Sequence, residues 1–211
     1  MTRTYHSMKL ALVPIAALSL SACVTPYTGP VEVTRFVAED TSALGTGSIS
    51  VAIRTGEDDG AERLDTTYRD AIMRELERLG YSASAAGEPD QQALANITTT
   101  PIETVQGRSG TSVGVGGSTG SFGGGVGLGI GFSLGGKNKN REVTQMEVRI
   151  TSQNTGETLW EGRAEIVTST DSAYNPPAEN ARALAAALFR DFPGGNGETV
   201  QLTVDELERT P

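Results

Sequence analysis

The sequence has almost none of the residue types on which most catalytic and metal sites depend. Of its 211 residues, only Cys23 is a cysteine and only His6 is a histidine. A single cysteine excludes an internal disulfide. If the chain is cut before Cys23, the mature protein also has no histidine to act as a base or a metal ligand. The composition therefore predicts a protein that is not an enzyme and that holds no metal and no cofactor.

The first 22 residues have the pattern of a secretory signal. Residues 1–9 are basic, with Arg3 and Lys9 and no acid, and an apolar run then extends from residue 10 to residue 20. A helix that spans a membrane needs about 20 apolar residues. The run is shorter than that, so it is typical of the central part of a cleaved signal peptide.

The apolar run ends in Leu20, Ser21, Ala22 and Cys23, which resemble the lipobox of bacterial lipoproteins. In a lipobox, small residues precede the bond that is cut, and the cysteine thiol receives diacylglycerol. The resemblance implies that residues 1–22 are a signal peptide and that Cys23 carries diacylglycerol and palmitate, which together anchor more firmly than one chain. Val24 follows, where aspartate would retain a lipoprotein at the inner membrane. We therefore expect the periplasmic face of the outer membrane.

Charge is strongly unbalanced in the part of the chain that follows Cys23. All 26 acidic residues follow it, whereas Arg3 and Lys9 precede it, so that 15 of the 17 basic residues remain and the net charge is −11. A domain of this charge should repel nucleic acid and anionic lipid surfaces. We expect no nucleic-acid partner, and we expect lipid on Cys23, rather than charge, to hold the protein at the membrane.

Hydrophobic periodicity predicts one α+β domain over residues 31–205, after a lipidated cysteine and tether at 23–30 and before an acidic tail at 206–211. Alternation predicts strands at 31–37, 47–54, 93–105, 142–151, 159–167 and 199–204. A stripe of Tyr68, Ile72, Leu76 and Leu79 predicts a helix that Asp65 caps and Gly80 ends. A second helix should begin at Asn175 and stop at 193–195, with the stripe Ala181, Leu184, Leu188 and Phe192. Residues 82–90 should form a loop. The simplest arrangement is a largely antiparallel sheet with two helices on one face.

A glycine-rich insertion at 107–140 interrupts this pattern, since 14 of the 26 glycines lie between residues 107 and 136. Within it, apolar residues alternate with small ones, which predicts a strand with one apolar face: Val126, Leu128, Ile130, Phe132 and Leu134. A weaker arm at 113–115 completes a hairpin that turns near 120–124. The hairpin could pack on the sheet. It could instead use its apolar face to contact an envelope protein partner or a second copy of the chain, or residues 111–136 could enter the membrane in an oligomer.

Several short motifs match enzyme signatures without the residues that those enzymes need. Residues 116–120 and 131–135 match G-x-S-x-G, but no histidine follows Cys23 to take the serine proton. Residues 131–137 match a phosphate loop, but Asn138 stands where a magnesium-binding serine or threonine belongs. The acidic pair at 58–59 and the cluster of Asp205, Glu206 and Glu208 lack the ligand spacing of a calcium loop.

Carboxylates alone can support glycoside hydrolysis, so a carboxylate-dependent hydrolase stays open as an alternative. The candidates on or beside predicted strands are Glu103, Glu142, Glu147, Glu161 and Glu165. Two of them within about 5–10 Å of each other in a cleft would favour it.

Three stretches resemble a family of bacterial envelope lipoproteins known as a domain of unknown function. They are the helix end at 76–81, the hairpin at 156–164 and the helix exit at 188–193, and the resemblance covers about residues 31–195. It implies no activity, and it implies packing and turn roles for Trp160, Gly162 and Pro193. The sequence as a whole predicts a non-enzymatic protein-interaction or envelope-structure module on the outer membrane. A self-assembling, membrane-active lipoprotein is the first alternative.

Overall fold

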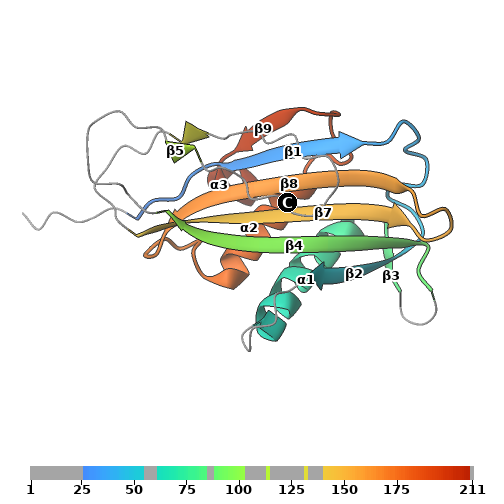
Figure 1. The fold of residues 1–211 in the computed structure, drawn as a ribbon, viewed down its shortest axis with the longest axis horizontal. Coiled ribbons are helices and arrows are strands. Elements are labelled where there is room, and N and C mark those ends of the chain that lie inside the picture. The colour runs from blue at the N-terminus through green and yellow to red at the C-terminus, as the bar shows by residue number, and fades with distance from the viewer. Residues whose placement is uncertain are drawn as a thin grey trace, which may run out of the picture.

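The computed structural model describes residues 26–54, 61–84, 88–102, 113–114, 131–132 and 140–209. Its main body is a seven-stranded sheet in the order β3-β2-β4-β7-β8-β1-β9 (Figure 1). The strands are β1 Val31–Val37, β2 Ser48–Arg54, β3 Ser82–Ala83, β4 Gln91–Ile102, β7 Arg141–Ser152, β8 Thr158–Ser169 and β9 Thr199–Leu202. Two further strands, β5 Val113–Gly114 and β6 Gly131–Phe132, pair with each other.

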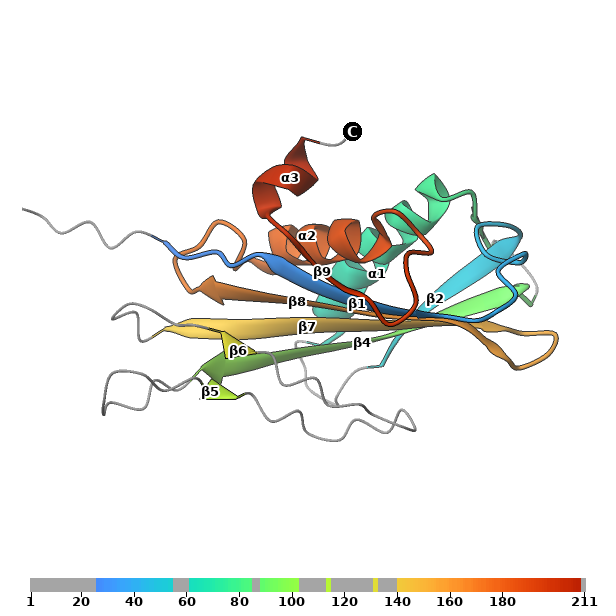
Figure 2. The ribbon, with the colours of Figure 1, turned by 90° about the horizontal axis from the view of Figure 1, so that it is seen from above.

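Three helices complete the fold, and Figure 2 places all of them on one side of the sheet. They are α1 Ala61–Arg78, α2 Pro177–Phe189 and the short α3 Val204–Glu208. The α+β class and the covering of one sheet face by α1 and α2 are as predicted. The helix α3 was not predicted, because five residues are too few to give a periodic signal.

The sheet is mixed, because β2 is parallel to both of its neighbours, β3 and β4. The chain leaves the end of β2, returns along α1 and re-enters the sheet in the same direction, which is the connection that parallel strands require. The strand β3 lies inside the segment 82–90 that we predicted as a loop, and it has only two residues. Every other pair of strands in the main sheet is antiparallel.

Helix boundaries differ from the predicted ones at both N-terminal ends. The helix α1 already includes Asp65, so this residue does not cap it. The helix α2 begins after Pro176, which makes no side-chain capping bond, while the Asn175 side chain accepts a hydrogen bond from Thr168 Oγ1 (3.2 Å). Gly80 does follow the end of α1 with a φ of 106°, a conformation that favours glycine.

The core lies between the sheet and the two long helices, where alternating strand residues meet the helix stripes. Its largest fully buried members come from five elements: Ile49, Ile72, Leu76, Met146, Ile150, Trp160, Ile166, Leu184 and Leu188. Phe192 also packs against this core, but it lies beyond the end of α2 instead of on its stripe.

Trp160 organises the far end of β8, and with Gly162, Phe189, Phe192 and Pro193 it forms what we call the Trp160 junction. Its ring stacks on Phe189, with centroids 5.4 Å apart, and its Nε1 donates a hydrogen bond to the Pro193 carbonyl (2.9 Å). A Cβ on Gly162 would lie 2.3 Å from the Trp160 ring, so only glycine fits there. Two of the three stretches that carry the family resemblance therefore meet in one packing unit.

Arg35 holds the exit of α2 next to this junction. Its Nε donates to Leu188 O (3.0 Å), and its Nη2 donates to Ala187 O (2.9 Å) and Arg190 O (2.8 Å). The last carbonyls of a helix have no partner within the helix and carry partial negative charge. A buried guanidinium from β1 supplies both the missing donors and the complementary charge.

Candidate functional site at the lead end of the sheet

Most residues predicted to act at the membrane lie outside the described part of the chain. These are the lipobox residues Leu20, Ser21, Ala22 and Cys23 and four residues of the insertion, Val126, Leu128, Ile130 and Leu134. Phe132 belongs to β6, where it pairs with Val113. The described chain begins at Pro26, so its first residues are the closest described point to Cys23.

Residues 26–30, which we call the lead segment, are attached to the end of β8. The Tyr27 amide donates to Ser169 Oγ (2.8 Å), and its carbonyl accepts from the Ser169 amide (2.9 Å). The Gly29 amide donates to Val167 O (2.8 Å), and the Thr28 and Ser172 hydroxyls are hydrogen-bonded (2.6 Å). We expected residues 26–30 to form part of a tether. They instead pair with the end of β8, so the part of the chain attached to the sheet begins within a few residues of Cys23.

The Tyr27 side chain packs on a small apolar cluster of its own. This cluster consists of Ile102, Val143 and Val167 and is separate from the main core. The Arg141 guanidinium lies 3.9 Å from the centre of the Tyr27 ring, within the range of a cation–π interaction. The lead segment is therefore fixed by side-chain packing as well as by backbone hydrogen bonds.

The two strands that flank the glycine-rich insertion in the sequence, β4 and β7, meet at this same end of the sheet. Ile102, the last residue of β4, is opposite Arg141, the first residue of β7, and Arg141 is opposite Ser169 at the end of β8. We call the end formed by Tyr27, Ile102, Arg141 and Ser169 the lead end of the sheet. Three parts of the described chain thus meet there: the lead segment, the end of β4 and the start of β7 (Figure 1).

Comparison with known proteins identifies the family. A family model described as a domain of unknown function (DUF4136) matches residues 38–194. The chain belongs to this family. The predicted membership in a domain of unknown function is confirmed, and the match leaves the lead segment and β1 outside it. No curated protein matches the chain.

Solved structures similar to this DUF4136 chain bear on its fold. A PDZ domain protein from Parabacteroides distasonis has a TM-score of 0.50 and 17% identity, over 83% of this chain and 38% of that one. The chain thus spans 38% of the length of that protein. Two PelC dodecamer structures from Paraburkholderia phytofirmans have TM-scores of 0.39, with 9% and 10% identity, over 75% of this chain and 93% and 94% of theirs. At these scores PelC supports no argument, and the PDZ domain protein supports the fold alone.

Two carboxylates of the DUF4136 chain lie side by side on the sheet face opposite the helices. Glu32 on β1 is directly opposite Glu165 on β8, so their Cβ atoms are about 4.5–5.5 Å apart. The two residues are only 9% and 7% exposed. Burial raises the pKa of Glu165, and the charge of Glu32 raises it further, while Arg163 lowers it. Glu165 was one of the predicted candidates, but the register that brings Glu32 to it has no sequence signal.

The other carboxylates along this face have partners that explain them structurally. Glu147 pairs with Arg163 (2.5 Å), and Glu161 pairs with Arg149 (2.6 Å). Glu32 accepts a hydrogen bond from Gln201 (2.6 Å). Alternating charges on neighbouring strands favour the observed register by such cross-strand pairs. Among the described carboxylates of this face, the carboxylate-hydrolase alternative therefore depends on Glu32 and Glu165, and Glu103 lies outside the described residues.

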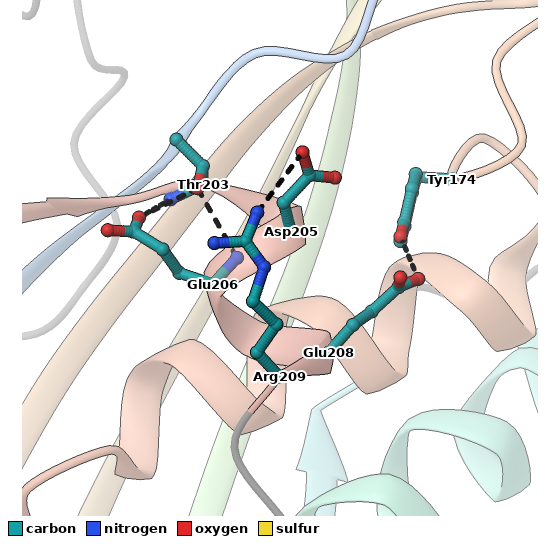
Figure 3. Close-up of polar contacts among 6 residues, drawn as sticks. All are labelled: Tyr174, Thr203, Asp205, Glu206, Glu208 and Arg209. Carbon is teal, nitrogen blue, oxygen red and sulfur yellow. Dashed lines mark hydrogen bonds and ion pairs between the residues drawn. The ribbon is translucent and has the colours of Figure 1, made fainter.

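A shallow groove of about 210 Å³ lies between α2 and α3. Ala183, Ala186, Val204 and Leu207 line it with apolar groups. On its rim, Tyr174 donates a hydrogen bond to Glu208 (Figure 3), and this bond is the main reason why the pKa of Tyr174 rises to about 12.

The acidic residues of α3 are each engaged by the chain itself. Glu206 and Thr203 form a reciprocal capping box at the start of α3, and Asp205 lies 4.0 Å from Arg209 (Figure 3). Among the described residues, no three acids, histidines or cysteines are arranged to hold a metal ion. None of the described helices combines the length and apolar character needed to cross a membrane.

Proposed function

We propose that this DUF4136 chain is an outer-membrane lipoprotein on the periplasmic side, anchored by lipid on Cys23. Its α+β domain serves as a non-enzymatic module for protein interaction or envelope structure, with the lead end of the sheet at the membrane. The attachment of the lead segment supports this proposal. Three residues separate Cys23 from Pro26, and each residue spans at most about 3.6 Å. Lipid on Cys23 would therefore hold the lead end within about 11 Å of the bilayer surface.

The anchor is tested by comparing wild-type protein with Cys23→Ser in cell-envelope fractions. We expect wild-type protein in the outer-membrane fraction with the mass of lipid on Cys23, and Cys23→Ser without lipid. Val24→Asp should move the lipidated protein to the inner membrane, while Ser19→Ala, outside the lipobox, should change nothing. Wild-type protein with an unmodified Cys23 would overturn the proposal.

The orientation is tested with two introduced cysteines on the lipidated protein, whose own cysteine no longer reacts. Thr170→Cys places a fluorescent label beside Ser169 at the lead end, and Glu157→Cys places it in the turn at the far end of β8. The 12 residues of β8 lie between the two positions, which are therefore about 40 Å apart. Spin-labelled lipid headgroups should quench the label at position 170 strongly and the label at position 157 weakly. Equal quenching would contradict the orientation.

A second candidate function is assembly through the hairpin at 111–136. The antiparallel pairs Val113 with Phe132 and Gly114 with Gly131 support it. Both pairs are centred on the same point of the sequence, between residues 122 and 123, as one hairpin requires. Flotation with liposomes tests it, using a chain that starts at Val24 with and without residues 111–136. If only the longer chain floats, the insertion itself binds membrane. If neither floats, lipid on Cys23 is the only anchor.

A further inference from the structure

Two amide side chains flank the buried carboxyl groups of Glu32 and Glu165. Gln201 on β9 is directly opposite Glu32, and Gln145 on β7 is directly opposite Glu165. The register therefore places these four side chains in one line across β9, β1, β8 and β7, which we call the carboxyl row. The row faces away from the helices, because Ala164, which precedes Glu165 on β8, lies in the core and successive strand residues point to opposite faces.

The hydrogen bonds of the two amides leave the carboxyl groups of the row facing each other. Gln201 donates to Glu32 (2.6 Å) and so satisfies one oxygen of that carboxylate. Gln145 instead donates to Glu147 (2.8 Å), two residues further along β7. Since the Cβ atoms of Glu32 and Glu165 are about 4.5–5.5 Å apart, their carboxyl groups can form a short O–H···O hydrogen bond when one of them carries a proton.

Charge compensation for the carboxyl row is incomplete within the described part of the chain. Arg163, two residues before Glu165 on β8, lowers the pKa of that carboxyl. The Arg163 guanidinium is already paired with Glu147 (2.5 Å), and its side chain is 43% exposed, so both the partner and water weaken its effect. Thr34, opposite Arg163 on β1, carries no charge. Burial and the charge of Glu32 prevail, and both raise the pKa of Glu165.

Two adjacent carboxyl groups that are only 9% and 7% exposed cannot both be ionised without a large energetic cost, and a pair of this kind holds one proton between its members. We propose that Glu32 and Glu165 share one proton as a carboxyl–carboxylate pair, and that loss of this proton loosens β1 from β8. As the pH rises, the proton passes to bulk water and leaves two negative charges directly opposite each other, which weakens a cross-strand pair. At lower pH, the shared proton replaces this repulsion by a charge-assisted hydrogen bond.

The position of the pair decides which part of the fold responds to pH. The strand β1 pairs with β8 on one side and with the short edge strand β9 on the other. Arg35 fastens the far half of β1 to the exit of α2 by three hydrogen bonds. The loosening is therefore confined to the half of β1 that contains Glu32 and follows the lead segment. It requires no lipid on Cys23, so it is independent of the proposed function.

Nuclear magnetic resonance tests the shared proton, using the full chain purified in detergent and labelled with ¹³C in its glutamate carboxyl groups. We expect the signals of Glu32 and Glu165 to titrate in two steps, the upper one above the ordinary range of a glutamate. Both signals should move in both steps, because a coupled pair titrates as a unit. Glu32→Gln should leave Glu165 with one step, at a lower pH than the upper step of wild-type protein. The control Glu161→Gln removes a paired acid from the same face of β8 and should leave both steps unchanged.

Hydrogen exchange at the Val33 amide tests the loosening of β1. Its protection, corrected for the intrinsic effect of pH on exchange, should fall by up to about fivefold as the pH rises through the upper step. Glu165→Gln cannot lose the proton and should abolish this fall. The amide of Val148, on the central strand β7, is the internal reference and should keep its protection throughout.

The outcomes that would overturn the proposal are distinct. Independent titration of the two carboxyl groups in the ordinary range would exclude a shared proton. So would two steps in which each signal moves only in its own step, because each proton would then belong to one carboxyl group. A constant protection of Val33 in wild-type protein, or a fall that persists in Glu165→Gln, would exclude the loosening of β1. The titration and the exchange of wild-type protein decide the proposal by themselves if a variant does not fold.

Discussion

The two ends of β8 show opposite ways of using the same strand. At the far end, the Trp160 junction is apolar, tightly packed and connected to α2 through Pro193 and Arg35. At the lead end, Ser169 and Tyr27 are joined by hydrogen bonds over a small separate cluster, and the Arg141 guanidinium lies on the face of the Tyr27 ring. Stability is therefore concentrated where the helices cover the sheet, whereas the lead end is held by a few hydrogen bonds and a small apolar cluster.

The largest effect should come from Trp160→Ala at the junction. The substitution removes the stacked ring and its hydrogen bond to Pro193 and leaves a cavity in the core. We expect a loss of about 3–5 kcal/mol in the free energy of unfolding, measured by urea denaturation. Trp160→Phe keeps most of the packing and should lose clearly less. A loss below about 1 kcal/mol for Trp160→Ala would contradict the conclusion that the Trp160 junction contributes more to stability than the lead end does.

Arg35→Met should rank second, because it removes two hydrogen bonds to carbonyls in the last turn of α2 and one to the Arg190 carbonyl just after it. Hydrogen bonds to charged groups contribute about 1.5–3 kcal/mol, and the bonds to the Leu188 and Ala187 carbonyls are buried. We expect a loss of about 2–3 kcal/mol. Arg35→Lys keeps the charge but not the planar fork and should recover only part of it. If Arg35→Lys had the full stability of wild-type protein, a positive charge alone would be enough to stabilise the C-terminal end of α2.

Tyr27→Ala tests the other end of the comparison. It removes the ring from Ile102, Val143 and Val167 and from Arg141, but the core is unchanged. We expect a loss of only about 1 kcal/mol in global stability, with much faster protease cleavage in the lead segment. Tyr27→Phe keeps the ring face and should behave like wild-type protein. A global loss as large as that of Trp160→Ala would show that the two ends are not distinct.

The smallest effect, and the only stabilising one, should come from Glu165→Gln, at a buried position on the sheet face opposite the helices. A carboxyl whose pKa is raised by folding favours the protonated form, so its penalty is present at pH 7 and is relieved as the pH falls. We expect Glu165→Gln to gain about 0.5–1 kcal/mol at pH 7. The gain should shrink as the pH falls through the raised pKa and vanish below about 4, the usual range of a glutamate. A gain that is constant with pH would contradict this explanation.

Much of the fold could be predicted, because its signals are local. The alternation of Val31 and Val33, the stripe of α1 and the glycine at position 80 each depend on a few neighbouring residues. Features that depend on distant residues were missed. The strand β3 is defined by its partner β2, and the start of α2 by proline geometry and not by an Asn175 cap, since that side chain is engaged by Thr168.

The features of the candidate site also fall into those that local sequence predicts and those that depend on distant residues. The sequence by itself determined the resemblance of residues 20–23 to a lipobox, the charge of the chain and the glycine-rich insertion, because each depends only on the order of residues. Only the tertiary structure decided that Tyr27, Ile102, Arg141 and Ser169 share one end of the sheet, and that Glu32 faces Glu165. Strand register is the physical reason: it is set by how the sheet fits against its helices as a whole, and no short stretch of sequence encodes it.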